Sequence, residues 1–366
     1  MKTIILKEEK NQLDSNKRRK MIKQAGEILR GGGLVALPTE TVYGLGADAL
    51  NEDAARKTYE AKGRPSDNPL IVHISKLDSL EEIVKEIPEK SKIVAKHYWP
   101  GPLTMVFEKN CRVPYGTTGG LETVAVRMPD HELARELIEA GGGFISAPSA
   151  NSSGRPSPTS AAHVAEDLSG KIDMIIDGGD VEIGVESTIL DMTSPVPMIL
   201  RPGAITKEML EALIGEVQVD PAIVDEHSTE RPKAPGMKYR HYAPKATLTI
   251  IEGDVENDGT IEAINWLVAK KEKEGYKVGV IGTEESLPFY KCQVVKSVGN
   301  RVQKESVAHN LYKVLRAFDE EDVDYIYSES FFTDGIGYAI MNRLLKAAGN
   351  RIIKAQDVII QKRGDK

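Results

Sequence analysis

Apolar residues between positions 21 and 29 recur at the spacing of one helix face. Asp14 or Ser15 can cap this helix, and the glycines at 31–33 end it. Short apolar runs typical of buried strands follow, and helical patterns separate several of them. The expected strands are residues 34–37, 70–74, 103–107, 123–128, 144–147, 174–176, 187–192 and 198–201, and the expected helices are 53–61, 91–97, 131–140 and 160–168.

Some of these strands are separated by helices, whereas others follow one another directly. A uniformly parallel sheet needs a crossover between each pair of strands, which this order does not supply. The pattern therefore predicts a wound, mixed α/β sheet with helices over residues 1–214.

The regular pattern stops between residues 215 and 245, where prolines stand at 221, 232, 235 and 244. We expect a linker here, although Tyr239, His241 and Tyr242 carry large rings that usually pack against something. Alternation resumes after residue 246, and residues 246–366 are expected to form a smaller Rossmann-like α/β domain. The strands expected there are 247–251, 278–281 and 325–328, and the helices are 261–273, 306–318 and 336–348. The domain has no glycine-rich dinucleotide loop, which favours support or regulation over a second catalytic centre.

Composition narrows the class of protein. The 366 residues carry a formal net charge of −7, which argues against a broad basic surface for nucleic acid. The two cysteines, Cys111 and Cys292, lack the spacing of a metal site, so neither a zinc site nor a disulfide framework is expected. No apolar run approaches the ~20 residues that span a bilayer, and we expect the protein in the cytoplasm without membrane contact.

The segment 62–73 has the chemistry of an anion site. Lys62 and Arg64 flank Gly63, so both charges can converge on one polyphosphate while the backbone approaches it closely. Pro65 and Pro69 stiffen the loop. A plain helix C-terminus, with glycine at the cap and cations near the negative end of the dipole, would have the same sequence.

Two other segments place hydroxyl and amide groups after apolar runs. Residues 146–157 lead from an apolar stub into a loop rich in serine and asparagine that opens a helix, where a phosphate can bind backbone N–H groups. Residues 38–46 follow the run 34–37. Neither is a Walker loop or a Gly-x-Gly-x-x-Gly fingerprint, and a solvated turn is the alternative for an isolated cluster of this kind.

Together these three segments resemble the YrdC family of L-threonylcarbamoyladenylate synthases. The matching motifs are Pro-Thr-Glu-Thr-Val-Tyr-Gly-Leu at 38–45, Lys-Gly-Arg-Pro-Ser-Asp-Asn-Pro-Leu at 62–70 and Ser-Ala-Pro-Ser-Ala-Asn-Ser-Ser-Gly at 146–154. The family's paired signature, Lys-x-Arg and Ser-x-Asn, reads here Lys62, Arg64, Ser149 and Asn151. The resemblance covers about the first 200 residues, and residues 235–244 resemble the linker of the family's two-domain branch.

The resemblance implies a nucleotidyltransferase that makes L-threonylcarbamoyladenylate from L-threonine, bicarbonate and ATP, with release of pyrophosphate, for threonylcarbamoyladenosine in tRNA. No covalent nucleophile is expected, and Lys62 and Arg64 would act electrostatically. Mg²⁺ would arrive on the ATP phosphates, with no protein metal site. The linker would act as a lid that shelters the unstable carbamate. A downstream transferase would be the partner, and contact with tRNA would be weak or indirect.

The resemblance also implies residue roles. The ATP-binding positions are Arg64, Asn68, Thr123, Ser149, Asn151, Ser157, Arg201 and Tyr242, and the threonine-binding positions are Thr41, His73, Arg127, Ala147 and Ser187. Plainer interpretations stay open: His73 as a core histidine, Arg201 as a surface cation and Asn68 as a turn former. Glu40 and Glu186 stand beside motif hydroxyls, and a structural role fits them equally well.

Two other classes compete with this one. A nucleic-acid binding module is disfavoured because basic runs interleaved with aromatic residues are absent from the sequence. A carbohydrate-phosphate lyase or synthase would need a carboxylate-rich metal centre, and none is evident near these motifs. A gel shift with bulk tRNA and an assay of threonine-dependent pyrophosphate release would separate the three.

Overall fold

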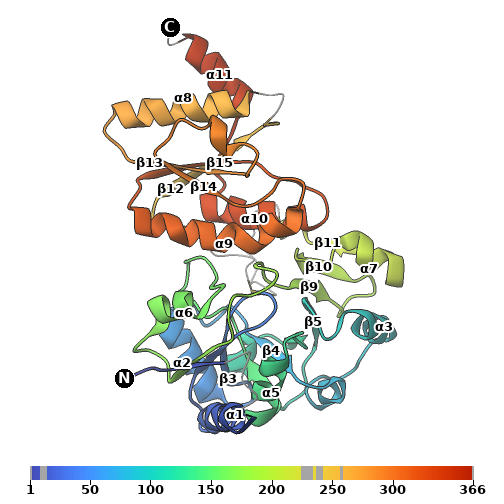
Figure 1. Ribbon diagram of the computed structural model, residues 1–366. Coiled ribbons are helices and arrows are strands. Elements are labelled where there is room, and N and C mark those ends of the chain that lie inside the picture. Colours follow the sequence, from blue (N-terminus) through green and yellow to red (C-terminus); the bar gives the residue numbers. More distant parts are fainter. Residues whose placement is uncertain (1, 9–14, 224–233, 236–241, 256–258, 365–366) are drawn as a thin grey trace. The chain divides into compact units, whose positions relative to one another are not determined.

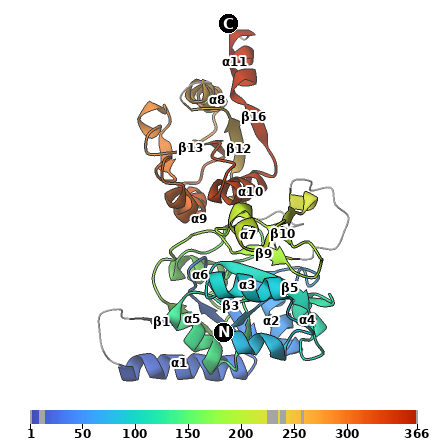
Figure 2. The same cartoon turned by 90° about the vertical axis from the view of Figure 1, so that its right-hand side faces the viewer.

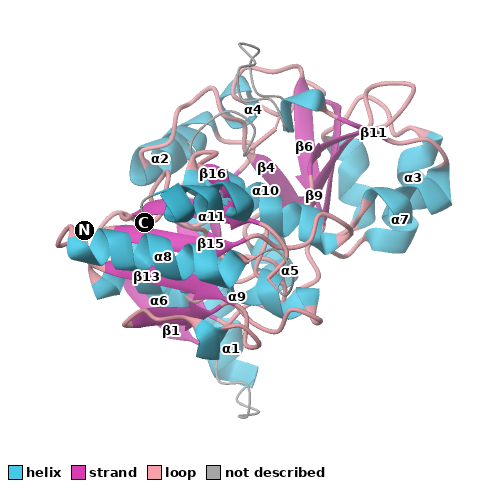
Figure 3. Cartoon of the chain, turned by 90° about the horizontal axis from the view of Figure 1, so that it is seen from above, coloured by secondary structure: helices cyan, strands magenta, loops and turns pink. Residues whose placement is uncertain are grey.

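The computed structural model describes residues 2–8, 15–223, 234–235, 242–255 and 259–364. The chain forms two compact units. The first comprises Met1–Ser153 and Ser157–Tyr239, and the second comprises Gly154–Pro156 and Arg240–Lys366. Both units combine helices with strands (Figure 3).

The first unit is built on a mixed sheet in the order β1-β8-β2-β3-β7-β4-β6-β5-β9-β10-β11. The sheet contains both parallel pairs, such as β4 with β6, and antiparallel pairs, such as β5 with β6, so the predicted mixed, wound sheet is confirmed. Its strands are β1 (Ile4–Lys7), β2 (Val35–Leu37), β3 (Gly44–Asp48), β4 (Ile71–Ile74), β5 (Leu103–Glu108), β6 (Thr123–Arg127), β7 (Phe144–Ser146), β8 (Met174–Asp177), β9 (Thr188–Asp191), β10 (Met198–Arg201) and β11 (Gln218–Val219).

Helices cover both faces of this sheet (Figure 2). Apolar side chains of α1 (Ser15–Arg30) and α5 (Glu132–Ala140) share one buried cluster with β2, β7 and β8. Those of α2 (Glu52–Lys62) and α6 (Ala161–Leu168) share another with β2, β3 and β8. The remaining helices are α3 (Glu89–Tyr98), α4 (Tyr115–Thr118), α7 (Lys207–Ile214) and the short 3₁₀ turns Leu77–Glu82 and Pro221–Ile223.

The second unit has a parallel sheet in the order β14-β13-β15-β12-β16, as expected for a Rossmann-like domain. In Figure 1, α8 and α11 lie on one face of this sheet and α9 and α10 on the other. Its elements are β12 (Thr247–Glu252), α8 (Thr260–Lys273), β13 (Val278–Gly282), a 3₁₀ turn (Leu287–Phe289), β14 (Val294–Ser297), α9 (Lys304–Glu321), β15 (Tyr325–Glu329), α10 (Ile336–Ala348), β16 (Ile352–Lys354) and α11 (Ala355–Gly364).

The unit boundary differs from the expected linker. Residues 218 and 219 form β11, which pairs with β10, so the first unit continues past residue 214 as far as Tyr239. Tyr239 and His241, on which the predicted lid depends, lie outside the described residues. The lid therefore stays a prediction.

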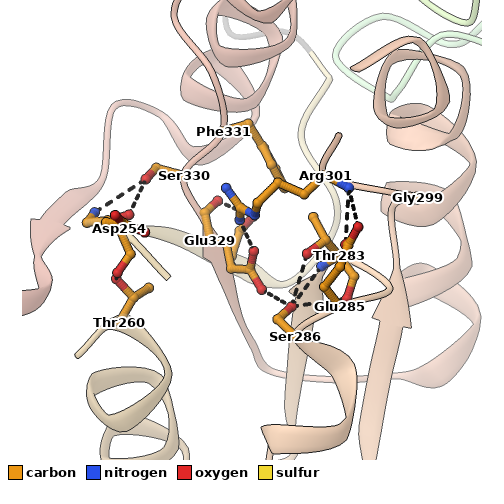
Figure 4. A network of polar contacts seen from close by, with 12 residues as sticks. Asp254, Thr260, Thr283, Glu285, Ser286, Gly299, Arg301, Glu329, Ser330 and Phe331 are labelled. Carbon is orange, nitrogen blue, oxygen red and sulfur yellow. Dashed lines mark hydrogen bonds and ion pairs between the residues drawn. The ribbon is translucent and has the colours of Figure 1, made fainter. Parts of the chain in front are cut away.

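A buried polar network occupies the carboxyl edge of the parallel sheet (Figure 4). Glu329 ends β15 with no exposed surface, and its carboxylate pairs with Arg301. Ser286 and Tyr290 donate hydrogen bonds to the same carboxylate, the latter at 2.6 Å. The network joins the loops that follow β13 (Ser286) and β14 (Arg301) to the end of β15, and the buried Nε of Arg301 has no hydrogen-bond partner. In the part of the chain that the structure describes, no helix is long and apolar enough to cross a membrane.

Candidate active site

A row of polar side chains crosses one face of the first unit's sheet. His73 on β4 is in register with Arg127 on β6, which is in register with Thr104 on β5. Residues that pair in register point to the same face. Ser187 directly precedes β9, and its hydroxyl lies 2.8 Å from that of Thr104. The fold thus brings three of the five predicted threonine-binding residues into one row.

Arg127 is the central cation of this row and is only 4% exposed. Its Nη1 donates a hydrogen bond to Thr41 Oγ1 at 2.9 Å, and Nε donates to the Gly101 carbonyl at 3.3 Å. Nη2 lies 2.6 Å from Oε1 of Glu40, but the angles are not those of a hydrogen bond. Both Glu40 oxygens and Arg127 Nη2 therefore keep unused bonding capacity at a buried position. A zwitterion that offers a carboxylate and an amine matches these open groups.

His73 is a neutral neighbour of Arg127. Its Nδ1 lies 3.1 Å from the Ile71 carbonyl oxygen, which can only accept, so Nδ1 carries the proton. Burial, together with the charge of Arg127, lowers the pKa of His73 from 6.5 to about 3. The ring is then uncharged at neutral pH, and Nε2 is a hydrogen-bond acceptor.

Arg201 joins the far end of the row. It ends β10, is 6% exposed, and donates to the Ser187 carbonyl at 3.0 Å and to the Ser187 hydroxyl at 3.1 Å. The alternative of a surface cation is therefore wrong. Arg201, a predicted ATP-binding residue, is thus hydrogen-bonded to Ser187, a predicted threonine-binding residue. Adjoining substrate sites would require such a contact.

Lys62 binds the second motif loop. It is the last residue of α2, and Gly63 caps the helix in the left-handed conformation, with φ of 62°. The Lys62 ammonium donates to the backbone oxygens of Ser149, at 2.5 Å, and Asn151, at 2.6 Å. The Lys-x-Arg and Ser-x-Asn motifs, far apart in sequence, are therefore in direct contact. In this arrangement Lys62 shapes the loop. Gly63 has the geometry of a helix cap, which is the alternative interpretation of this segment from its sequence.

The loop that follows α2 holds Arg64 and Asn68. Arg64 donates to the carbonyls of Asn68, at 3.2 Å, and Pro69, at 3.0 Å. Asn68 is 1% exposed, and its Oδ1 has no hydrogen-bond partner, which suits a ligand better than a simple turn. Thr123 begins β6, whose other end is Arg127. Lys62 and Arg64 bond to different segments, so their convergence on one polyphosphate stays a prediction.

The other predicted residues fall in three places. Ser157 donates to Oε1 of Glu186 at 2.6 Å, next to Ser187 in the chain. Ala147 follows β7, and its N–H donates to the Ile71 carbonyl on β4 at 2.9 Å. Tyr242 belongs to the second unit, where its ring lies 5.0 Å from that of Tyr312.

The prediction from sequence missed Thr104 and gave Glu40 and Glu186 no site role. Thr104 stands in an apolar strand, where a hydroxyl needs a partner, but its partner Ser187 is 83 residues away. Glu40 is buried against Arg127, and Glu186 accepts from Ser157. For Glu40, the sequence signal for a role in the site was its position inside the motif at residues 38–45.

The arrangement can bind a small zwitterion beside a polyanion, and it offers hydrogen-bond donors rather than a nucleophile with its base. Among the described residues, no group of three or more His, Cys, Asp or Glu side chains could hold a metal ion.

Comparison with known proteins agrees with this geometry. A family model described as "Telomere recombination" matches residues 27–203, and one described as "Threonylcarbamoyl-AMP synthase, C-terminal domain" matches residues 205–349. A threonylcarbamoyl-AMP synthase of Bacillus subtilis is 53% identical over 334 residues, which cover 91% of this chain and 94% of that protein. One from Pyrococcus abyssi is also 53% identical, over 333 residues that cover 91% of this chain and 95% of that protein.

Solved structures agree as well. The crystal structure of Pyrococcus abyssi Sua5 complexed with L-threonine has a TM-score of 0.88 and 50% identity, and the match covers 97% of this chain and 99% of that one. A structure of a double-alanine variant of Pyrococcus abyssi Sua5 has a TM-score of 0.89 and 50% identity, with 96% of this chain and 98% of that one covered. These matches extend over both units. The chain belongs to the threonylcarbamoyl-AMP synthase family, in the branch that has the additional C-terminal domain.

Proposed function

We propose that the protein makes L-threonylcarbamoyl-AMP from L-threonine, bicarbonate and ATP, and releases pyrophosphate. The observation that carries this proposal is the buried Arg127, whose Nη1 donates to Thr41 and whose open Nη2 lies beside the open carboxylate of Glu40. The relatives' names and the L-threonine complex of the Pyrococcus abyssi protein support it.

The chemistry suits a site without a nucleophilic side chain. The threonine amine attacks the carbon of bicarbonate, and loss of water leaves a carbamate. A carbamate oxygen then attacks the α-phosphorus of ATP, and the bond from that phosphorus to the bridging oxygen of pyrophosphate breaks. Such a reaction depends on positioning and on stabilising negative charge.

In the threonine half, Arg127 Nη2 binds the carboxylate of the amino acid. Glu40 accepts a hydrogen bond from the amine, and His73 Nε2 accepts one from the threonine hydroxyl or amine. The row from His73 to Ser187 supplies these groups within one layer of side chains. Because the pocket must house the threonine methyl, we expect it to discriminate against serine by about 1 to 3 kcal/mol.

In the ATP half, Lys62 shapes the Ser149–Asn151 turn, and Arg64, Asn68, Thr123, Ser157, Arg201 and Tyr242 complete the predicted set. Asn68 supports this assignment because its buried side-chain oxygen has no hydrogen-bond partner. Mg²⁺ would enter as part of the ATP substrate, held by phosphate oxygens and water. The product is a mixed anhydride, so a transferase that moves the threonylcarbamoyl group to tRNA would consume it, and direct tRNA binding by this chain would be weak.

The test is pyrophosphate release from ATP with single substrates omitted. We expect release only when L-threonine and bicarbonate are both present, and threonine-independent release at the full rate would refute the proposal. Arg127→Lys keeps the charge but loses the planar fork, and should raise the KM for threonine about 10- to 100-fold, as expected for a charged hydrogen bond of about 1.5 to 3 kcal/mol. Arg56→Lys, on the exposed face of α2, is the matched control.

A further inference from the structure

Bicarbonate differs from the other two substrates of the proposed reaction in having no predicted binding residue. The predicted residues divide into an ATP set and a threonine set, and one member of the polar row on the first unit's sheet, Thr104, belongs to neither. Thr104 has no exposed surface and stands on β5 in register with Arg127. A hydroxyl at such a position is costly unless it is hydrogen-bonded, so its bonding indicates its role.

The hydrogen bond between Thr104 and Ser187 has a preferred direction. Among the described residues, the only hydrogen-bond partner of Thr104 Oγ1 is Ser187 Oγ, at 2.8 Å. A threonine hydroxyl carries one proton, and this proton is used only if Thr104 donates to Ser187. The reverse direction would leave it buried without an acceptor, which is unfavourable.

Ser187 Oγ accepts a second hydrogen bond, from Arg201. Nη2 of Arg201 lies 3.1 Å from this oxygen, and a guanidinium can only donate. With both lone pairs of Oγ occupied, Ser187 can act towards any further group only as a donor. Ser187 is 1% exposed, and its own proton has no acceptor in the part of the chain that the structure describes. An acceptor supplied by a ligand would satisfy the protons of both hydroxyl groups.

The backbone holds Ser187 in place. Its carbonyl accepts from Arg201 Nε at 3.0 Å, and the N–H of the next residue, Thr188, donates to the Pro102 carbonyl at 3.0 Å. Gly203 packs so closely here that a Cβ at its position would lie 2.3 Å from the Thr188 nitrogen. The donor oxygen is therefore positioned before a ligand arrives, which suits the stabilisation of negative charge.

We propose that Ser187, oriented by Thr104, is the hydrogen-bond donor for bicarbonate and for the carbamate formed from it. The proposal rests on the proposed function, in which Arg127 binds the threonine carboxylate and Arg201 belongs to the ATP set. Thr104 is in register with Arg127, and Ser187 is bonded to Arg201, so the donor lies between the two substrates. Thr104 acts through Ser187 and is a positioning residue.

The chemistry requires bicarbonate at the same place. Its carbon has to bond to the threonine amine, and one of its oxygens then has to reach the α-phosphorus of ATP. Bicarbonate and carbamate are both anions whose oxygens accept hydrogen bonds, so a hydroxyl that can only donate suits either of them. Contact with the carbamate on the threonine nitrogen also agrees with the assignment of Ser187 to threonine.

The experiment measures steady-state pyrophosphate release by the full chain in degassed buffer, with bicarbonate, threonine and ATP varied in turn. Thr104→Val removes the hydroxyl and keeps the side-chain shape. It should raise the KM for bicarbonate about fivefold, as expected for a neutral hydrogen bond, and leave the KM for threonine and for ATP within about twofold. Thr104→Ser retains the donor and should recover most of the loss. Thr58→Val is the matched control, because Thr58 is a buried threonine whose hydroxyl donates to the Ala54 carbonyl within α2.

A double-mutant cycle tests whether Thr104 acts through Ser187. Ser187→Ala should raise the KM for bicarbonate by more than Thr104→Val does, and the double variant should raise it no further. A rise in the KM for threonine as large as that for bicarbonate would place Ser187 on the amino-acid carboxylate and overturn the proposal. Ser187→Ala removes a single oxygen, so an unchanged KM for bicarbonate in this variant would overturn the proposal even if Thr104→Val did not fold.

Failure of the proposed function gives a different result. Wild-type protein would then release no pyrophosphate in response to threonine and bicarbonate, and both proposals would be wrong. If the wild type depends on both substrates but Thr104→Val and Ser187→Ala behave like Thr58→Val, the bicarbonate site alone is overturned.

Discussion

At the scale of single residues, the site is defined by charged side chains that are buried away from water. Arg127 and Glu40 are each 4% exposed, and their hydrogen bonding is incomplete. Arg127 in turn keeps the adjacent His73 neutral, because a second positive charge beside a buried cation is unfavourable. A neutral imidazole adds an acceptor to a group that otherwise consists mostly of donors.

His73 makes the stability of the first unit depend on pH. Its pKa is about 3 in the folded state, below the ordinary 6.5, so the unfolded chain binds more protons between these values. Stability should therefore be complete above pH 6.5 and fall as the pH drops towards 3, by at most about 1.4 kcal/mol per pH unit from this residue. His73→Gln should flatten that slope between pH 6.5 and pH 4.5.

The measurement is urea unfolding at several pH values in a Trp266→Phe background. The chain has two tryptophans, and Trp99 then reports on the first unit alone. Exposed His97→Gln is the control. A His73→Gln protein with the wild-type slope would show that His73 does not titrate in this way.

At the scale of elements, both units place their polar groups where strands end. Ser187 precedes β9, Arg127 and Arg201 end their strands, and Glu329 ends β15. Both sets also contain buried atoms without a hydrogen-bond partner. In the first unit these include Arg127 Nη2 and both carboxylate oxygens of Glu40. In the second unit the Glu329 carboxylate accepts bonds from three neighbours, whereas Arg301 Nε has no partner.

We expect the buried ion pair of Glu329 with Arg301 to contribute to the stability of the second unit. Glu329→Ala removes the counter-charge of Arg301, and breaking a buried ion pair typically costs about 3 to 5 kcal/mol. We expect the lower part of that range, because the Arg301 side chain is 23% exposed. Urea unfolding in a Trp99→Phe background, with Trp266 as the reporter, should show the loss, with exposed Glu320→Ala close to zero. A large rise in the KM for threonine with unchanged stability would contradict this assignment.

At the scale of the whole molecule, the chain forms two units. The sequence enters the second unit twice, at Gly154–Pro156 and from Arg240 onwards. The relatives that match this chain over both units share the two-domain organisation.

Tyr242 tests the contribution of the second unit and of the linker. Tyr242→Ala should raise the KM for ATP because it removes the ring that packs on Tyr312 and loosens the neighbouring bond from Ala243 to Gly154. Tyr242→Phe keeps the ring and should remain close to the wild type unless the hydroxyl itself binds ATP. Kinetics with ATP and threonine varied in turn provide the measurement. An unaltered KM and turnover in Tyr242→Ala would show that the linker only connects the units.

The local sequence was sufficient for the elements with a strong periodic pattern. The helix expected at 336–348 is α10, and the strands expected around 71, 103, 123 and 198 are β4, β5, β6 and β10. It was not sufficient for β3, whose residues Gly44 and Gly46 are poor strand formers. A Cβ at Gly46 would lie 2.8 Å from Leu37 Cδ2 and 3.0 Å from the Val35 carbonyl. Glycine is required there by the close approach of β2, which local propensity does not contain.

The sequence by itself determined the family, the mixed sheet and the motif residues, because these depend on residue order and local pattern. Only the tertiary structure decided which residues meet. Strand register placed Thr104 between Arg127 and Ser187, and burial paired Glu40 with Arg127. Within the second unit, it also bonded Arg316 to the Pro156 carbonyl and Asp319 to Arg155, at separations of 160 and 164 residues. Such contacts form between segments whose pairing is selected by the packing of the whole chain, so no local sequence pattern predicts them.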